Sequence, residues 1–432
     1  MSGLRQLSDD KMKRSPDGHN LAVRVNGGRT RLYLAAALAA ALLLGAWLLF
    51  DHNHKKPNIK IGVLHSLSGT MAASETPLVD ALRLALEEAN QSGGIDGAQI
   101  EMVVSDCRSD ANYCAQQAEK LITEDGVQAL FGCWTSACRK ALKPVVEKHH
   151  HLLFYPVQYE GLEQSPDIVY TGAAPNQQLI PMVAWAMQQR GKRAFLVGSD
   201  YVFPRTANQI VKKLLLATGG QAVAERYVPL GEQNLDSIVR EIAKQHPDFV
   251  LNTLNGDSNQ YFFRALLKAG IRAADIPVFS TSIAEAELAA MGPELVAGHY
   301  AAWNYFQSVD SEENRAFIAR FRRRFGPGRV LDDPMEASYI GMKLWVNARR
   351  SAGTPDMHTV KIVLAQQTLA APEGIVAVDA ETHHLWKRMR IGRARADGQF
   401  EIVWQSGRSM APAPFPFFIP RAQRDALAAG AP

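Results

Sequence analysis

The sequence predicts an α/β protein built from two lobes, each with a parallel sheet covered by helices. The first observation is its length, because 432 residues exceed what one compact core normally serves. The second is that short apolar segments alternate with amphipathic stretches of helical length from residue 58 onward, which is typical of parallel sheets with right-handed crossovers. The third is that this alternation occurs in two successive runs of similar length, which indicates two similar lobes.

The N-terminus carries the only imbalance of charge. Residues 1–31 contain seven Lys/Arg and three Asp, so the rest of the chain has 40 basic and 40 acidic residues. A neutral body argues against a nucleic-acid partner.

Residues 32–50, "LYLAAALAAALLLGAWLLF", contain no charge, and a helix of this length just spans a hydrocarbon core of roughly 30 Å. The basic residues before it place the N-terminus in the cytoplasm and the body outside, because positive charge is retained inside. We expect an uncleaved membrane anchor over residues 32–50. The alternative is a signal peptide, but the leader is long and no small-x-small site follows the apolar stretch.

The first run of elements begins after residue 58. The predicted strands are 59–67, 99–106 and 127–132, and the predicted helices are 76–94, 111–126 and 137–151. In the second run, the predicted strands are 193–200, 221–228, 248–254 and 276–282, and the helices are 203–220, 235–246 and 258–270.

A third section supplies helices at about 311–325 and 335–351 and then β-rich segments at 374–380, 384–398 and 399–407. Late elements of this kind often complete sheets that are already started, so the chain is expected to cross between lobes more than once. We expect one lobe from residues 57–174 and 304–353, a second from 175–303 and 354–419, and a tail at 420–432.

Polar residues follow most of the predicted strands. In an open parallel sheet, ligands bind beyond the carboxyl ends of the strands. Two lobes lined with such turns would face one another across a cleft, so the sequence predicts a binding site there.

Catalytic motifs are missing from these turns. The stretch 132–140, "GCWTSACRK", lacks the G-x-S-x-G of a nucleophile elbow, and no phosphate-binding glycine motif or zinc-binding histidine motif occurs. A lone Asp after a strand is more often a helix cap than a general acid. We therefore expect neither an enzyme nor a metal or cofactor.

All four cysteines lie in one short window, at Cys107, Cys114, Cys133 and Cys138. Export would make them candidates for disulfides, and four cysteines allow three pairings, among which the spacing does not decide.

The wording of the turns resembles a known family. The resemblance runs from about residue 58 to 418 and rests on eight stretches in order: "LHSLSGTMAASET", "GCWTSACRK", "FYPVQYEG", "YTGAAPNQQ", "GSDYVFPR", "LNTLNGDSN", "HYAAWNYFQS" and "APEGIVAVDAETHHLWKRMRIG". These stretches resemble the urea-binding proteins of urea ABC transporters and, more distantly, the amide-sensing regulator of amidase operons.

This resemblance implies a type I periplasmic-binding-protein fold, with two doubly wound lobes joined by hinge strands that close on a ligand. It also implies a periplasmic substrate-binding component that delivers urea or a short-chain amide to permease subunits. The alternative function is a membrane-anchored urea or amide sensor. The candidate anchor at 32–50 and the cysteines other than Cys133 depart from the family pattern.

The resemblance also implies which residues bind the ligand. Urea is flat and neutral, so its site needs acceptors for the amide hydrogens, donors to the oxygen and a flat apolar face. The predicted ligand-binding residues are Ser68, Trp134, Thr135, Ser136, Tyr155, Gln158, Tyr201, Phe203, Asn255, Asp257, Ser282 and Glu285.

Each of these residues also has a purely structural interpretation. Trp134 and Tyr155 fit a lobe core, and Ser136 fits a helix N-cap. Asn255 and Asp257 fit plain turns.

Overall fold

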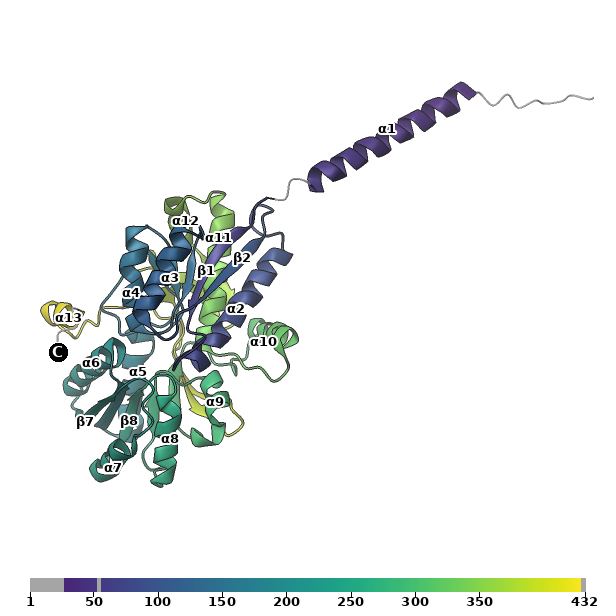
Figure 1. Cartoon of the computed structure of the whole chain (residues 1–432). Helices are drawn as coiled ribbons and strands as arrows, with labels where there is room; N and C mark the ends of the chain where they lie inside the picture. The colour runs from purple at the N-terminus through teal and green to yellow at the C-terminus, as the bar shows by residue number, and fades with distance from the viewer. Residues whose placement is uncertain (1–26, 53–55, 429–432) are drawn as a thin grey trace, which may run out of the picture. The chain divides into compact units, whose positions relative to one another are not determined.

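The structure is a computed structural model that describes residues 27–52 and 56–428 (Figure 1). Side chains are described for residues 31–45 and 56–428. The chain divides into two units, residues 1–55 and residues 56–432, and each is described by itself.

The first unit contains the helix α1 (Gly27–His52). The membrane anchor predicted over residues 32–50 is not supported, because within the described part of the chain no helix is long and apolar enough to cross a membrane. Residues 46–50 and most of the predicted basic leader lie outside the described side chains.

The first lobe is built on a parallel sheet of five strands in the order β2-β1-β3-β4-β5. Its central strands are apolar on both faces, as strands between two helical layers must be; Ile61 and Val63 are fully buried, and so is Leu64. The strands are β1 (Ile59–His65), β2 (Ile100–Asp106), β3 (Leu130–Gly132), β4 (Leu153–Tyr155) and β5 (Ile168–Tyr170).

Helices cover both faces of this sheet. Because β1 lies between β2 and β3, right-handed crossovers place α2 and α3 on opposite faces. One layer joins α2 to α11, and the other joins α3 to α4 (Figure 1). The helices of this lobe are α2 (Ala72–Gln91), α3 (Ala111–Thr123), α4 (Ser136–Lys148), α10 (Glu312–Phe325), α11 (Asp333–Ala352) and α12 (Met357–Leu364).

The second lobe contains a sheet of seven strands in the order β15-β14-β10-β9-β8-β6-β7. Alternate residues of β6 enter opposite cores: Phe195 and Val197 face one helical layer, while Ala194 and Leu196 face the other. The strands are β6 (Arg193–Ser199), β7 (Gln221–Val228), β8 (Phe249–Thr253), β9 (Val278–Ser280), β10 (Tyr300–Trp303), β14 (Arg390–Ala394) and β15 (Phe400–Gln405).

Strands β6 to β10 of this sheet are parallel, whereas β14 and β15 add to it as antiparallel strands. The helical elements of this lobe are η1 (Pro175–Gln177), α5 (Leu179–Arg190), α6 (Val202–Ala217), α7 (Asp236–Gln245), α8 (Ser258–Lys268), α9 (Glu285–Met291) and η2 (Pro293–Leu295), and α13 (Arg421–Ala428) follows in the predicted tail.

Residues 354–386 lie with the first lobe, although the sequence analysis assigned them to the second. They form α12 and a small sheet of β11 (Thr368–Ala371), β12 (Gly374–Val378) and β13 (Leu385–Trp386). Val376 and Leu385 belong to the first lobe's hydrophobic core, and burial of these apolar side chains holds the segment there.

The chain passes between the two lobes three times, after β5, after β10 and between β13 and β14. Asn304 joins all three crossings, because its Nδ2 donates to the carbonyl oxygens of Gln177 at 3.1 Å and Arg388 at 3.2 Å. Nearby, Lys387 Nζ lies 3.2 Å from Glu373 Oε1 and donates to the Thr171 carbonyl oxygen at 2.8 Å. These buried polar contacts hold the hinge in one arrangement.

Candidate binding site between the lobes

A cavity of about 100 Å³ lies between the lobes, at the carboxyl ends of β1, β2 and β3 on one side and of β6 and β7 on the other. This is where an open α/β sheet binds its ligands. The lining residues are Ser66, Met71, Glu75, Cys107, Ser109, Asp110, Ala111, Thr135, Ala137, Cys138, Tyr201 and Leu230. Thr135 and Tyr201 are the members of this set that the sequence analysis predicted.

The turn from Cys133 to Cys138 forms one wall of this cleft. Gly132 enters it with φ +135°, and a Cβ there would lie 1.9 Å from the Leu64 carbonyl oxygen, so only glycine fits. Thr135 then caps α4, with its side chain accepting a hydrogen bond from Cys138 N at 3.2 Å. The N-cap is therefore Thr135, one residue before the Ser136 considered for that position.

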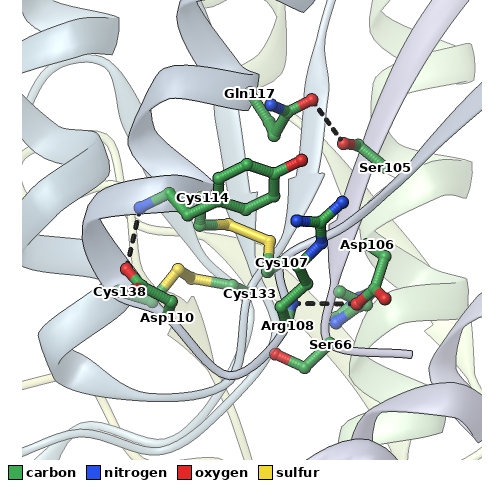
Figure 2. Close-up of a disulfide and its surroundings, with 12 residues drawn as sticks. Ser66, Ser105, Asp106, Cys107, Arg108, Asp110, Cys114, Gln117, Cys133 and Cys138 are labelled. Atoms are coloured by element: carbon green, nitrogen blue, oxygen red, sulfur yellow. Dashed lines mark hydrogen bonds between the residues drawn. A yellow bond between two sulfur atoms is a disulfide. The ribbon is translucent and has the colours of Figure 1, made fainter. Parts of the chain in front are cut away.

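Two disulfides lie side by side next to the cavity (Figure 2). The structure pairs Cys133 with Cys138 and Cys107 with Cys114. Cys138 is therefore not bridged to Cys107 or Cys114. Among the described residues, the only cluster with the composition of a metal site is Cys107, Cys114 and Cys138, and all three are disulfide-bonded.

Direct hydrogen bonds join the lobes. Trp134 Nε1 donates to Asn255 Oδ1 at 3.2 Å. Gln158 Nε2 donates to the Thr281 carbonyl oxygen at 2.8 Å and lies 2.9 Å from Ser282 Oγ. The lobes are therefore in contact across the cleft.

One side-chain oxygen of the residues that make these contacts has no hydrogen-bond partner among the described residues. Gln158 Oε1 is buried and has no hydrogen-bond partner within the described part of the chain. Such a group is a ready acceptor for a ligand N–H.

Tyr155 lies behind Trp134, and its hydroxyl donates to the Trp134 carbonyl oxygen at 2.5 Å. Burial raises the pKa of Tyr155 well above its usual range, so the hydroxyl keeps its proton and remains a donor. The same cause raises the pKa of Tyr201. Tyr201 lines the cavity and keeps its O–H there at neutral pH, whereas the Tyr155 hydrogen is taken by the Trp134 carbonyl oxygen.

A buried ionic network contacts this turn through Ser136. Arg139 Nη2 lies 2.9 Å from Glu160 Oε1, and its Nε lies 2.9 Å from Glu163 Oε1. Ser136 Oγ donates to Glu160 Oε2 at 2.6 Å. Burial alone would raise the pKa of Glu163, but the guanidinium of Arg139 outweighs it and holds that pKa at about 2. Ser136 is therefore tied to the ionic network.

Ten of the twelve predicted residues are not on the lining of the cavity, and four of these ten also take no part in the contacts described above. Ser68 Oγ donates to Asp106 Oδ2 at 2.7 Å in an exposed loop. Phe203 is buried in the core of the second lobe, and Asp257 is exposed at the start of α8. Glu285 faces the hinge, where its Oε1 accepts from Gln307 N at 2.7 Å.

Sequence reasoning missed Glu75, which lines the cavity. Its Oε2 accepts from Ser66 N at 2.9 Å and lies 3.0 Å from His65 Nδ1. Helix α2 begins at Ala72, earlier than the predicted residue 76, so Glu75 is in the first turn and faces the cleft. An acidic residue immediately after a polar strand-to-helix turn was the available signal.

The arrangement of His65 does not resemble a catalytic one. Its Nε2 is buried and has no partner within the described residues, so the ring activates no hydroxyl there.

Two α/β lobes that are linked by three crossings and meet over a polar cavity define a class of protein, those that close around a small molecule. Residues 59–421 match the family model of the periplasmic binding protein domain, and the chain belongs to this family. The predicted type I periplasmic-binding-protein fold is confirmed.

One curated relative matches most of this chain, and another matches a short part of it. "Leu/Ile/Val-binding protein homolog 6" of Brucella melitensis is 24% identical over 347 residues, which cover 78% of this chain and 88% of the relative. A "Limonene hydroxylase" of Geobacillus stearothermophilus is 36% identical over 116 residues, but the match covers 27% of this chain and only 21% of that protein.

Solved structures show the same fold. A solute-binding protein of an ABC transporter from Rhodopseudomonas palustris BisB5, in complex with 3,4-dihydroxybenzoic acid, has a TM-score of 0.75 at 21% identity and covers 82% of this chain and 99% of its own. A leucine-binding protein from Thermotoga maritima has a TM-score of 0.72 at 17% identity, over 80% of this chain and 98% of its own.

Proposed function

We propose that this chain is the periplasmic substrate-binding component of an ABC transporter and that it captures urea or a short-chain amide between its lobes. The observation that carries the proposal is the small cavity between the lobes, whose walls come from strand-to-helix turns of both. Its family membership and the transporter proteins of the same fold support the transport role.

The size of the cavity favours a ligand of few atoms. A volume of about 100 Å³ is small for a ligand pocket, since such pockets typically measure roughly 300–1,000 Å³. An aromatic acid, such as the one in the Rhodopseudomonas complex, would require the lobes to separate further.

The polar groups around the cleft suit an amide. Gln158 Oε1 is an acceptor without a partner in the described structure, and the Tyr201 hydroxyl on the lining stays protonated. The N-terminus of α4 also supplies backbone N–H groups, which favour a carbonyl oxygen.

Titration calorimetry on the purified full chain tests the proposal, with urea, acetamide, benzoate and leucine as ligands. We expect saturable heat with urea or acetamide and none with benzoate or leucine. Saturable binding of benzoate or leucine without binding of either amide would contradict it.

A further inference from the structure

The Glu75 carboxylate gives the cavity a specific chemical character. Glu75 is only 2% exposed and lines the cavity from the first turn of α2. Both hydrogen bonds that it accepts from described residues, from Ser66 N and at His65 Nδ1, end on Oε2. Oε1 is therefore left to accept from a ligand, because an ionised carboxylate offers about four acceptor positions.

No positive side chain on the lining offsets this carboxylate. Among the described residues that line the cavity, Glu75 and Asp110 are acidic and none is Lys, Arg or His. Arg108, next to Cys107 in the sequence, lies over the Tyr113 ring, 4.4 Å from its centroid. The charged groups on the lining are therefore all acidic.

The charged groups behind the wall do not reverse this sign. Arg139 is paired with both Glu160 and Glu163, each at 2.9 Å, so that network has an acidic surplus. His65 contacts Glu75 through Nδ1, an atom that a neutral imidazole can also use as a donor. The field at the cavity consequently favours a positive ligand and disfavours an anionic one.

The hydroxyl groups of the wall are partly occupied. Ser66 Oγ accepts from Ser109 N at 3.0 Å, and Thr135 Oγ1 accepts from Cys138 N at 3.2 Å. The carboxylates, in contrast, can only accept. These carboxylates therefore require a ligand that donates, while the two hydroxyls keep their hydrogens free to donate.

On the basis of the proposed function, we propose that the cleft prefers small planar diamino cations, guanidinium or an amidinium, over neutral urea, with Glu75 as the residue that selects for charge. Guanidinium has the shape of urea, with a third NH₂ group and a positive charge in place of the carbonyl oxygen. Two parallel N–H groups fit a carboxylate in a fork geometry, and such charge-assisted hydrogen bonds are roughly twice as strong as neutral ones.

Calorimetry on the full chain distinguishes this inference from the proposed function. The ligands are guanidinium chloride, acetamidinium chloride, urea and acetamide, at millimolar concentrations and equal ionic strength. We expect the cations to bind at least tenfold more tightly than urea. If urea binds as tightly as the cations, or more tightly, the inference fails and the proposed function stands. If none of the four ligands binds, both fail.

A pair of variants tests the role of Glu75. Glu75→Gln keeps the shape and removes the charge, so guanidinium affinity should fall at least tenfold while urea affinity stays within threefold. Glu87→Gln removes the same charge from the outer face of the same helix, where Glu87 pairs with Arg324 at 2.8 Å, and should leave the preference unchanged.

Equal losses for guanidinium and urea in a folded Glu75→Gln protein would overturn the assignment of Glu75. A thermal melt of each variant reports folding. If Glu75→Gln does not fold, the ligand series on the unmodified chain still decides whether the cleft prefers cations.

Discussion

Single side chains join the two lobes at the cleft, and Gln158 makes two of these bonds, to the Thr281 carbonyl oxygen and to Ser282 Oγ. We predict that Gln158→Ala weakens ligand binding roughly tenfold, because the closed form loses hydrogen bonds that contribute about 1 kcal/mol each. Titration calorimetry measures the change. Gln116→Ala, at an exposed position on α3, serves as the control, and an equal loss in both variants would contradict the assignment.

Arg139 offers a second test at the same scale, because it is fully buried between Glu160 and Glu163. Replacing it with methionine leaves two buried carboxylates without their partner, which typically costs about 3–5 kcal/mol. We therefore predict that Arg139→Met lowers the free energy of unfolding by that amount at pH 7, as measured by urea denaturation.

The matched control for Arg139→Met is Arg324→Met, since Arg324 pairs with Glu87 at the surface and such pairs contribute about 1 kcal/mol or less. The loss in Arg139→Met should also shrink in acid. The pKa of Glu163 is held at about 2, so its stabilisation is present above pH 4.5 and is lost as the pH falls through 2.

The sequence predicted some parts of the site better than others. Trp134, Gln158, Asn255 and Ser282 follow strands directly, and parallel strands bring such positions to one edge, where the structure joins them across the cleft. Glu75 was missed because its direction depends on where α2 begins, and helix ends are the least certain feature of a sequence pattern.

At the scale of the elements, a disulfide constrains the turn after β3. It joins Cys133 to Cys138 and closes the loop that carries Trp134 and Thr135. Closing so short a loop reduces the entropy of the unfolded chain and stabilises by about 2 kcal/mol. We predict that the double variant Cys133→Ala/Cys138→Ala loses this stability and binds the ligand at least fivefold more weakly, as thermal melts and calorimetry would show.

The neighbouring disulfide provides the control for this prediction. Cys107–Cys114 spans a sequence separation of 7, against 5 for Cys133–Cys138, so the double variant Cys107→Ala/Cys114→Ala should lose a similar amount of stability. The Cys107–Cys114 disulfide does not close the turn that carries Trp134 and Thr135. The ligand affinity of its double variant should therefore fall less. Equal affinity losses would contradict a specific role of the Cys133–Cys138 disulfide in binding.

Most of the longer strands and helices were predictable because each has a local signature, a short apolar run or an amphipathic period. Helix α5 and the short strands β4, β5 and β10 were not predicted. The lobe assignment of residues 354–386 was not predictable, because it depends on a distant surface. Val376 and Leu385 are apolar in any context, and only the folded first lobe supplies the core that buries them. Tertiary packing of this kind leaves no local trace in the sequence.

At the scale of the whole molecule, the hinge contains an excess of buried acids. Burial raises the pKa of Glu285 and of Glu336 well above the usual range. It also raises the pKa of Glu373 to about 7, although Lys387 opposes the shift. These carboxyl groups hold protons in the folded chain that the unfolded chain releases. The stability that they contribute is therefore complete below about pH 4.5 and is lost as the pH rises through 7 and beyond.

The pH dependence of stability follows from this sign. Buried histidines act in the opposite direction, since burial lowers the pKa of His299 to about 4 and of His384 to about 3, but their effect is complete above about pH 6.5. Between pH 7 and 9 we predict a decline in the free energy of unfolding, with a limit of about 1.4 kcal/mol per pH unit for each such acid.

Glu336→Gln isolates this effect, because glutamine imitates the protonated acid and can still accept from Glu373 N, which lies 3.2 Å from Glu336 Oε1. The variant removes one titrating group and the repulsion that Glu336 exerts on Glu373. Urea denaturation at pH 7, 8 and 9 should therefore show a shallower decline than in the unmodified chain. Glu101→Gln, at an exposed position on β2, should leave the decline unchanged. A decline in Glu336→Gln as steep as in the unmodified chain would mean that Glu336 is already ionised in the folded hinge.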